Sequence, residues 1–376
     1  MSISTEVITL RGQEGYRDAI FRAARLLADG GLVAFPTETV YGIGANAANF
    51  DAVRRLREVK ERVEDKPFTV HIARRDDLGR FVPEPGRIGR RLVEKAWPGP
   101  LTMIFDVADL DAAPVLAKLP GRQTHTLYHE GTIGLRCPDD ACASDLLEAA
   151  AVPVVAASAN RAGRAAPANA PEVLEELDGK IDLLLDTGTT RYAKASTIVR
   201  VRDDGYEIVR PGLYDDRMLR RFLTTNFLFV CTGNTCRSPM AAALCRKLLA
   251  ERLGCDPEEL EDRGYGVLSA GAFASGGARA SDGAIAAMRK RGLDIGSHRS
   301  QPLTVELIHA ADHVFVMCAS HREAVLGLVG SAEGRTRLLG ADGPIDDPVG
   351  GPDSVYEQCA EDIEKALRRR LEEISL

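Results

Sequence analysis

Residues 226–240 read NFLFVCTGNTCRSPM, the order of a strand, a tight loop and a helix. Residues 228–230 form a short apolar run typical of a buried parallel strand. Pro239 falls where proline is accepted, in the first turn of a helix. Between strand and helix lie Cys231 and Arg237, the two ends of a Cys-x5-Arg element. The stretch therefore predicts a loop that begins with a cysteine at the carboxyl end of a strand.

A loop of this kind suits a phosphoryl group. Successive backbone N–H groups and a helix N-terminus converge on phosphate oxygens, and Arg237 can add a bidentate fork. Gly233 and Asn234 tolerate the positive φ that such a loop needs, and Ser238 can hydrogen-bond a thiolate. A cysteine that ends a buried strand is by itself more often an inert core residue. The succession of strand, loop and helix favours Cys231 as a nucleophile.

At residues 230–241, VCTGNTCRSPMA, the chain resembles the low-molecular-weight protein tyrosine phosphatase family, and the resemblance extends from Asn226 to the end of the sequence. It implies that Cys231 and Arg237 are catalytic. The implied phosphate-binding positions are Thr232, Gly233, Asn234, Thr235, Cys236 and Ser238. It also implies that the phosphatase needs no metal and no cofactor.

A general acid is expected near the end of the chain, where residues 345–356 read IDDPVGGPDSVY. Family members carry an Asp-Pro pair on a late loop, and Asp347 with Pro348 matches it, whereas Asp346 does not precede a proline. The alternative for such a run is a plain surface turn. The resemblance implies that Cys231 attacks phosphorus, that Asp347 protonates the leaving atom, and that Asp347 then activates water.

Two features favour phosphoarginine over phosphotyrosine as the substrate. Thr235 stands where tyrosine-directed relatives commonly have an aliphatic residue, and its hydroxyl can accept a hydrogen bond from a guanidinium. Residues 349–351, Val-Gly-Gly, stand where those relatives present aromatic side chains. The combination resembles the protein arginine phosphatase branch. A tyrosine phosphatase with a reduced rim is the alternative.

Two other cysteines leave alternatives open. Cys236 lies in the same loop as Cys231, and it either captures the oxidised nucleophile as a disulfide or packs under the loop. Cys318 has no close downstream cysteine, which argues against an arsenate reductase of the same architecture.

The composition describes an ordinary globular chain long enough for two domains. It has 376 residues, of which 45% are hydrophobic and 27% charged. The net charge of −7 argues against a dominant nonspecific nucleic-acid clamp. No apolar run approaches the roughly 20 residues of a membrane span, and the first residues lack a signal-peptide core, so we expect a cytoplasmic protein with no membrane partner. Eight scattered cysteines form neither a disulfide framework nor a zinc pattern.

Short polar motifs follow apolar segments throughout the first half of the chain, which is where open α/β sheets place ligands. In order they are PTETVYG (36–42), Lys60-x-Arg62, PGPLT (98–102), LRCP (135–138), Ser158-x-Asn160 and Ser196-Thr197-Ile198. This ordered set resembles the YrdC-like family, the threonylcarbamoyl-AMP synthases, from about Glu6 to Gly212.

That resemblance implies an enzyme that condenses L-threonine, bicarbonate and ATP with Mg²⁺ into threonylcarbamoyl-adenylate and pyrophosphate, and that supplies the tRNA-modification machinery. Thr37 is expected to contact threonine, and Lys60 and Arg62 to hold its carboxylate and the triphosphate. Ser158 and Asn160 are expected to contact the nucleotide and the magnesium-bound phosphates. Arg136, Ser196 and Arg210 are expected to line the same concave sheet. The chain departs from the family pattern at Glu61, Val63 and Ala157. The alternative to a working synthase is a domain that binds nucleotide or RNA without catalysis.

The predicted fold class is α/β in both halves. Residues 1–215 are expected to form a YrdC-like domain with a twisted open sheet, and residues 225–376 a small doubly wound phosphatase domain with a parallel sheet. A short connector is expected between them. Predicted helices are 16–27, 51–60, 239–253 (amphipathic) and 282–291; predicted strands are 68–72, 267–270 and 314–317, and residues 194–201 and 206–212 are expected to pair as a hairpin.

Overall fold

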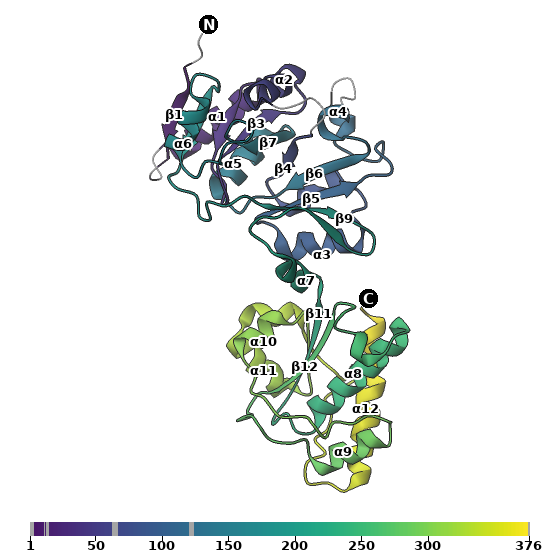
Figure 1. Cartoon of the computed structure of the whole chain (residues 1–376). Coiled ribbons are helices and arrows are strands. Elements are labelled where there is room, and N and C mark those ends of the chain that lie inside the picture. The colour runs from purple at the N-terminus through teal and green to yellow at the C-terminus, as the bar shows by residue number, and fades with distance from the viewer. Residues whose placement is uncertain (1–3, 11, 13–14, 62–66, 120–123, 375–376) are drawn as a thin grey trace. The chain divides into compact units, whose positions relative to one another are not determined.

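The computed structural model describes residues 4–10, 12, 15–61, 67–119 and 124–374. Arg62, one of the expected cations, lies outside these residues. The chain divides into two compact units, Met1–Leu223 and Thr224–Leu376, each with its own sheet (Figure 1). No helix in the described part of the chain has the length and apolar character needed to cross a membrane.

The first unit is built on a mixed sheet that, within the described residues, has ten strands in the order β1-β8-β2-β3-β7-β4-β6-β5-β9-β10. Its strands are β1 (Glu6–Thr9), β2 (Val33–Phe35), β3 (Gly42–Asn46), β4 (Thr69–His71), β5 (Leu101–Asp106), β6 (Thr132–Arg136), β7 (Val154–Ser158), β8 (Leu183–Asp186), β9 (Thr197–Val201) and β10 (Tyr206–Arg210). The predicted open α/β sheet is confirmed, and β9 and β10 pair antiparallel as the expected hairpin.

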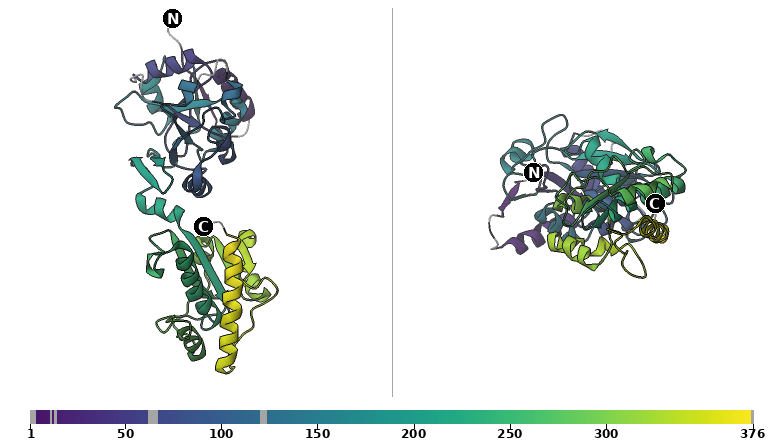
Figure 2. Two further views of the ribbon diagram at one scale, coloured as in Figure 1. Left: turned by 90° about the vertical axis from the view of Figure 1, so that its right-hand side faces the viewer. Right: turned by 90° about the horizontal axis from the view of Figure 1, so that it is seen from below.

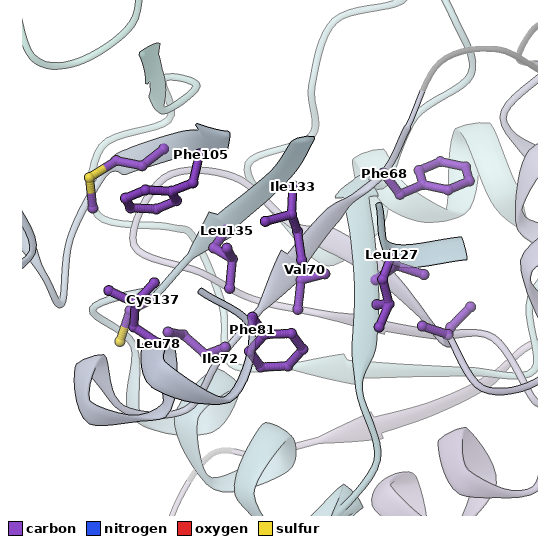
Figure 3. Close-up of a cluster of buried hydrophobic side chains, with 14 of the residues drawn as sticks. Phe68, Val70, Ile72, Leu78, Phe81, Phe105, Leu127, Ile133, Leu135 and Cys137 are labelled. Carbon is purple, nitrogen blue, oxygen red and sulfur yellow. The ribbon is translucent and has the colours of Figure 1, made fainter. Parts of the chain in front are cut away.

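Helices cover this sheet, and central strands such as β2 and β3 are buried on both faces. They are α1 (Tyr16–Ala28), α2 (Phe50–Val59), α3 (Gly86–Ala96), α4 (Thr124–Leu127), α5 (Ala141–Ala150), α6 (Ala170–Leu177) and α7 (Asp216–Leu223). On β7, Val154 and Ala156 pack with α1 and α5, while Val155 belongs to the other core. Figure 3 shows part of that second core, where Val70 of β4 lies beside Ile133 and Leu135 of β6.

The second unit contains a smaller sheet whose neighbouring strands are all parallel, in the order β12-β11-β13-β14. Its elements are β11 (Thr225–Cys231), α8 (Arg237–Leu253), β12 (Tyr265–Gly271), α9 (Asp282–Arg289), α10 (Val305–Ala310), β13 (His313–Val316), α11 (Ala319–Leu328), β14 (Thr336–Leu338) and α12 (Asp353–Glu372). Phe227 and Phe229 pack with α8, α9 and α12, whereas Leu228 and Val230 pack with α10 and α11. The predicted doubly wound parallel sheet is confirmed, and Figure 2 shows α12 in yellow running alongside it.

Helix α8 differs from its prediction. The sequence pattern predicts an amphipathic helix, but every residue from Arg237 to Cys245 is buried. The reason is that α8 packs against strands β11 and β12 and also against α12 (Figure 1). This buried first half carries small side chains such as Ala241, Ala242 and Ala243, which let its neighbours approach closely. In the second half of α8, Arg246, Glu251 and Arg252 are exposed.

Candidate active sites

The Cys-x5-Arg loop lies at the centre of the second sheet. Cys231 is the last residue of β11, which has β12 on one side and β13 on the other, and Arg237 begins α8. The loop packs on Gly271 at the end of β12. A Cβ atom there would lie 2.8 Å from the carbonyl oxygen of Thr232 and 2.9 Å from the backbone nitrogen of Asn234. Glycine at 271 is therefore required for the loop to sit where it does.

Asn234 fixes the shape of this loop. It adopts a left-handed conformation with a φ of 55° and is fully buried. Its side-chain amide donates to Ser238 Oγ at 2.8 Å and to Ser269 Oγ at 2.9 Å, and its Oδ1 accepts from the backbone of Gln301 at 2.9 Å. Ser238 Oγ lies 3.0 Å from the sulfur of Cys231. Asn234 thus aims the serine at the expected nucleophile.

Arg237 is 5% exposed and reaches the late loop that carries the expected acid. Its Nη1 donates to the carbonyl oxygen of Ile345 at 3.0 Å, and its Nη2 forms an ion pair with Asp347 and donates to Thr232 Oγ1 at 3.4 Å. The Asp347 side chain is 41% exposed, so it remains accessible to a ligand. The loop, the guanidinium and an accessible carboxylate together form an arrangement that can bind a phosphoryl group and move a proton.

The remaining loop residues face different surroundings. The sulfur of Cys236 contacts Ser281 Oγ at 3.2 Å and the Tyr356 hydroxyl at 3.9 Å, and both Cys231 and Cys236 are free thiols. These contacts place the reduced Cys236 thiol under the loop, and capture of an oxidised Cys231 by Cys236 stays a prediction. Thr235 is partly exposed on the loop, and its hydroxyl has a single weak contact, 3.6 Å from the Cys236 sulfur, among those described.

Sequence reasoning missed three side chains beside this loop. His298 Nε2 lies 2.8 Å from the carbonyl oxygen of Asn234, and His321 Nε2 lies 2.9 Å from Thr232 Oγ1. Phe273, whose backbone nitrogen donates to the Thr232 carbonyl at 2.9 Å, has a side chain that is 74% exposed. No motif marks these residues, because each reaches the loop from a segment distant in sequence.

The first unit contains a cavity of about 270 Å³ at the ends of several strands. Strand register places Arg136 beside His71 on one side and Thr102 on the other. The lining includes six of the expected residues: Thr37, Arg136, Ser158, Asn160, Ser196 and Arg210. The structure therefore brings together side chains that are up to 173 positions apart, counting from Thr37 to Arg210 (210 − 37 = 173).

Arginine side chains give this cavity a positive field. Arg136 is buried and its Nη2 donates to Glu38 Oε1 at 2.9 Å and to Thr39 Oγ1 at 2.7 Å. Arg210 donates to Ser196 Oγ at 3.2 Å. Partial burial, and then the charge of Arg136, lower the pKa of Arg210. Because these two like charges face one cavity, it favours an anionic ligand.

Lys60, expected to hold the threonine carboxylate and the triphosphate, is engaged within the protein in this structure. It is 6% exposed at the end of α2, and its Nζ donates to the Ser158 carbonyl at 2.6 Å and to Asn160 Oδ1 at 3.1 Å. It also contacts the Asn160 carbonyl. In this structure the lysine therefore holds the turn that follows β7, whose residues line the cavity.

Two residues without a predicted role, Glu38 and His71, lie beside Arg136. Glu38 is the buried partner of Arg136, and the PTETVYG motif that contains it was the available signal. His71 lines the cavity and donates from Nδ1 to the Thr69 carbonyl at 3.2 Å. Burial, and then the charge of Arg136, lower the pKa of His71 to about 3, so its imidazole is neutral at physiological pH.

A larger depression of about 1110 Å³ lies elsewhere in the first unit. Its charged lining consists of Glu84, Asp106, Asp109, Glu130, Asp203, Asp204 and Arg202. Such a predominantly acidic lining repels nucleotides and carboxylates. The smaller, positive cavity is therefore the better candidate for an anionic substrate despite its size.

Known proteins match the two halves separately. The family model of Sua5, YciO and YrdC, described as telomere recombination, matches residues 25–212. A second family model, described as low molecular weight phosphotyrosine protein phosphatase, matches residues 226–375. A threonylcarbamoyl-AMP synthase from Bacillus subtilis (strain 168) is 39% identical over 196 residues, which are 51% of this chain and 53% of that protein. A protein-arginine-phosphatase from Geobacillus stearothermophilus is 38% identical over 152 residues, which are 39% of this chain and 94% of that protein.

Among solved structures, P. abyssi Sua5 complexed with L-threonine has a TM-score of 0.50 and 22% identity, over 97% of this chain and 98% of that one. This is a likeness of fold. The chain spans about half the length of the first synthases that it matches, 53% in each case.

Proposed function

Because this chain belongs to the Sua5, YciO and YrdC family over residues 25–212 and to the low molecular weight phosphotyrosine protein phosphatase family over residues 226–375, we propose that it carries two active sites with different chemistries. Both family resemblances drawn from the sequence are thereby confirmed. We assign the synthase to residues 1–215 and the phosphatase to residues 225–376, with α7 between them; α7 packs with the core of the first unit through Leu219.

The first site is proposed to make threonylcarbamoyl-adenylate from L-threonine, bicarbonate and ATP, for transfer to tRNA by a later enzyme. The positive cavity supports this assignment, because threonine presents a carboxylate and ATP a triphosphate. Mg²⁺ bound to ATP would neutralise part of the phosphate charge. Thr37 and Arg136 are the residues proposed to contact threonine, and Arg210 and Ser196 are those proposed to contact the phosphates. The hydrogen bond between Lys60 and Asn160 is proposed to shape the nucleotide subsite. Arg62 is proposed as a further phosphate contact on the basis of the sequence resemblance.

Pyrophosphate release tests this proposal. Wild type incubated with ATP, Mg²⁺ and bicarbonate should release pyrophosphate only when L-threonine is added, because adenylate formation needs the threonylcarbamate as nucleophile. D-threonine is the matched control and should give only background release. Nucleotide or RNA binding without threonine-dependent release would favour the non-catalytic alternative.

The second site is proposed to hydrolyse phosphorylated protein side chains. Cys231 attacks phosphorus while the loop amides and Arg237 hold the equatorial oxygens. Asp347 leaves its ion pair with Arg237, takes up a proton from solvent, and gives that proton to the departing atom as its bond to phosphorus breaks. The resulting carboxylate then removes a proton from the water that cleaves the cysteinyl-phosphate and frees the Cys231 thiolate. The observation that carries the proposal is the buried Arg237 shared between the loop and Asp347.

Phosphoarginine is the proposed substrate of this site. Thr235 presents a partly exposed hydroxyl that can accept from a guanidinium, and residue 349, next to the proposed acid, is a valine that is 66% exposed instead of an aromatic wall. Phe273 does not decide between the substrates, because an aromatic ring stacks on a guanidinium as well as on a phenol. A phosphotyrosine phosphatase is the second candidate, since the matching family model carries that name.

Thr235→Ile should lower the ratio of kcat/KM for phosphoarginine over phosphotyrosine peptides by roughly tenfold, which is the worth of one hydrogen bond to a charged group. Thr235→Ser is the matched control and should keep the preference because it retains the hydroxyl. The specificity assignment is wrong if wild type prefers phosphotyrosine, or if the isoleucine variant keeps the wild-type ratio.

A further inference from the structure

His321 lies beside the phosphatase loop, and the mechanism above gives it no task. It belongs to the first turn of α11 and is 2% exposed. Its Nε2 lies 2.9 Å from Thr232 Oγ1, and its Nδ1 lies 3.3 Å from the sulfur of Cys318. A histidine so deeply buried, with both ring nitrogens engaged, has a fixed ring orientation.

The contacts of Thr232 connect His321 to Arg237. The Arg237 guanidinium donates to Thr232 Oγ1 at 3.4 Å, so this oxygen is held from two sides. Burial, and then the positive charge of Arg237, lower the pKa of His321. The imidazole is therefore neutral at physiological pH, and a neutral ring can exchange a hydrogen bond with the hydroxyl without repelling the guanidinium further.

The proposed reaction makes this contact more important as it proceeds. In the resting structure Arg237 Nη2 is shared between Asp347 and Thr232. Once Asp347 turns to the leaving group, Thr232 is the side chain among these described partners that still engages Nη2. The guanidinium must stay aligned at that moment, because it holds the phosphoryl oxygens in the transition state.

We propose that His321 is a positioning residue for phosphoryl transfer, which holds the Thr232 hydroxyl against Arg237 and so keeps the guanidinium aligned after Asp347 has left it. The proposal rests on the proposed phosphatase function. Because the alignment matters in the transition state more than in the substrate complex, loss of His321 should lower kcat with little change in KM.

Two variants separate the hydrogen bond from the packing. His321→Phe keeps a ring of similar shape and removes both nitrogens, and it should lower kcat for p-nitrophenyl phosphate roughly tenfold, as one lost hydrogen bond would. His321→Gln can place an amide group near the position of Nε2 and should retain most of the wild-type kcat. His309→Gln changes an exposed histidine on α10 and serves as the unaffected control.

A double-mutant cycle identifies the route of the effect. In a Thr232→Val background, His321→Phe should cost nothing further, because the hydroxyl it holds is gone. Equal losses for His321→Phe and His321→Gln, or losses that multiply in the double variant, would overturn the proposal. If His321→Phe does not fold, as judged by its thermal unfolding, Thr232→Val decides alone: a roughly tenfold lower kcat at unchanged KM supports the proposal, and an unchanged kcat overturns it. Wild type without any phosphatase activity would instead refute the proposed function itself.

Discussion

Cys231→Ser is expected to lower phosphatase activity by roughly 10³-fold or more, because a serine hydroxyl is scarcely ionised at neutral pH and is a poor nucleophile without a base. Cys231 ends β11 with its sulfur 3.0 Å from Ser238 Oγ, and the side chain is 3% exposed. Serine is slightly smaller and polar, and Ser238 can still hydrogen-bond it. The fold should therefore survive, and hydrolysis of phosphoarginine and p-nitrophenyl phosphate, followed as released phosphate or nitrophenol, should disappear together.

Cys255→Ser is the matched control for that substitution. Cys255 is a partly exposed thiol of the same unit that follows α8, and its replacement should leave hydrolysis unchanged. Substantial phosphatase activity in Cys231→Ser would show that another group is the nucleophile. A loss of activity in Cys255→Ser would point to a general effect of removing thiols.

Arg210→Met should lower kcat/KM for threonine-dependent pyrophosphate release by roughly 100-fold, the loss expected when a charged group no longer meets an anion. The Arg210 guanidinium faces the same cavity as Arg136, whose positive charge disfavours a second cation there. Among the described residues, its hydrogen bonds go to the carbonyl oxygen and the hydroxyl of Ser196. Arg210 is exposed at the end of β10, so its removal should change the melting temperature little. A side chain whose loss harms activity far more than stability serves a ligand.

Arg202→Met is the control for the charge change. Arg202 follows β9 on the same hairpin, pairs with Asp106 and Glu207, and lines the acidic depression instead of the positive cavity. Its removal should leave pyrophosphate release unchanged. Equal losses in the two variants would mean that net charge, and not the position of Arg210, sets the rate. Unchanged release in Arg210→Met would remove this residue from the proposed site.

Local sequence patterns were sufficient for the elements that carry the loop chemistry. The apolar run at residues 228–230, with Pro239 soon after, predicted the central strand and the following helix, and both are observed as β11 and α8. The pattern failed on the burial of α8. Amphipathicity is judged from one helix alone, whereas coverage of the opposite face by α12 is a property of the folded domain.

The motifs of the first unit predicted which residues gather in the cavity but not how each one acts. Lys60 is expected at the threonine carboxylate and the triphosphate, which stays a prediction, and the structure adds its contacts with the carbonyls of Ser158 and Asn160. Glu38 lies inside the PTETVYG motif, but its pairing with Arg136 arises only in the folded sheet. His71 in this unit and His321 in the second unit went unnoticed because their contacts across strands and loops have no periodic or spaced signature in the sequence.

The central claim is that one chain carries two independent active sites, and a crossed assay tests it most directly. Wild type, Cys231→Ser and Arg210→Met would each be measured for threonine-dependent pyrophosphate release and for phosphoarginine hydrolysis in the same preparations. We expect wild type to be active in both assays, Cys231→Ser to lose only hydrolysis, and Arg210→Met to lose most of its pyrophosphate release and none of its hydrolysis. Absence of either activity in wild type, or loss of both activities from a single folded variant, would contradict the claim.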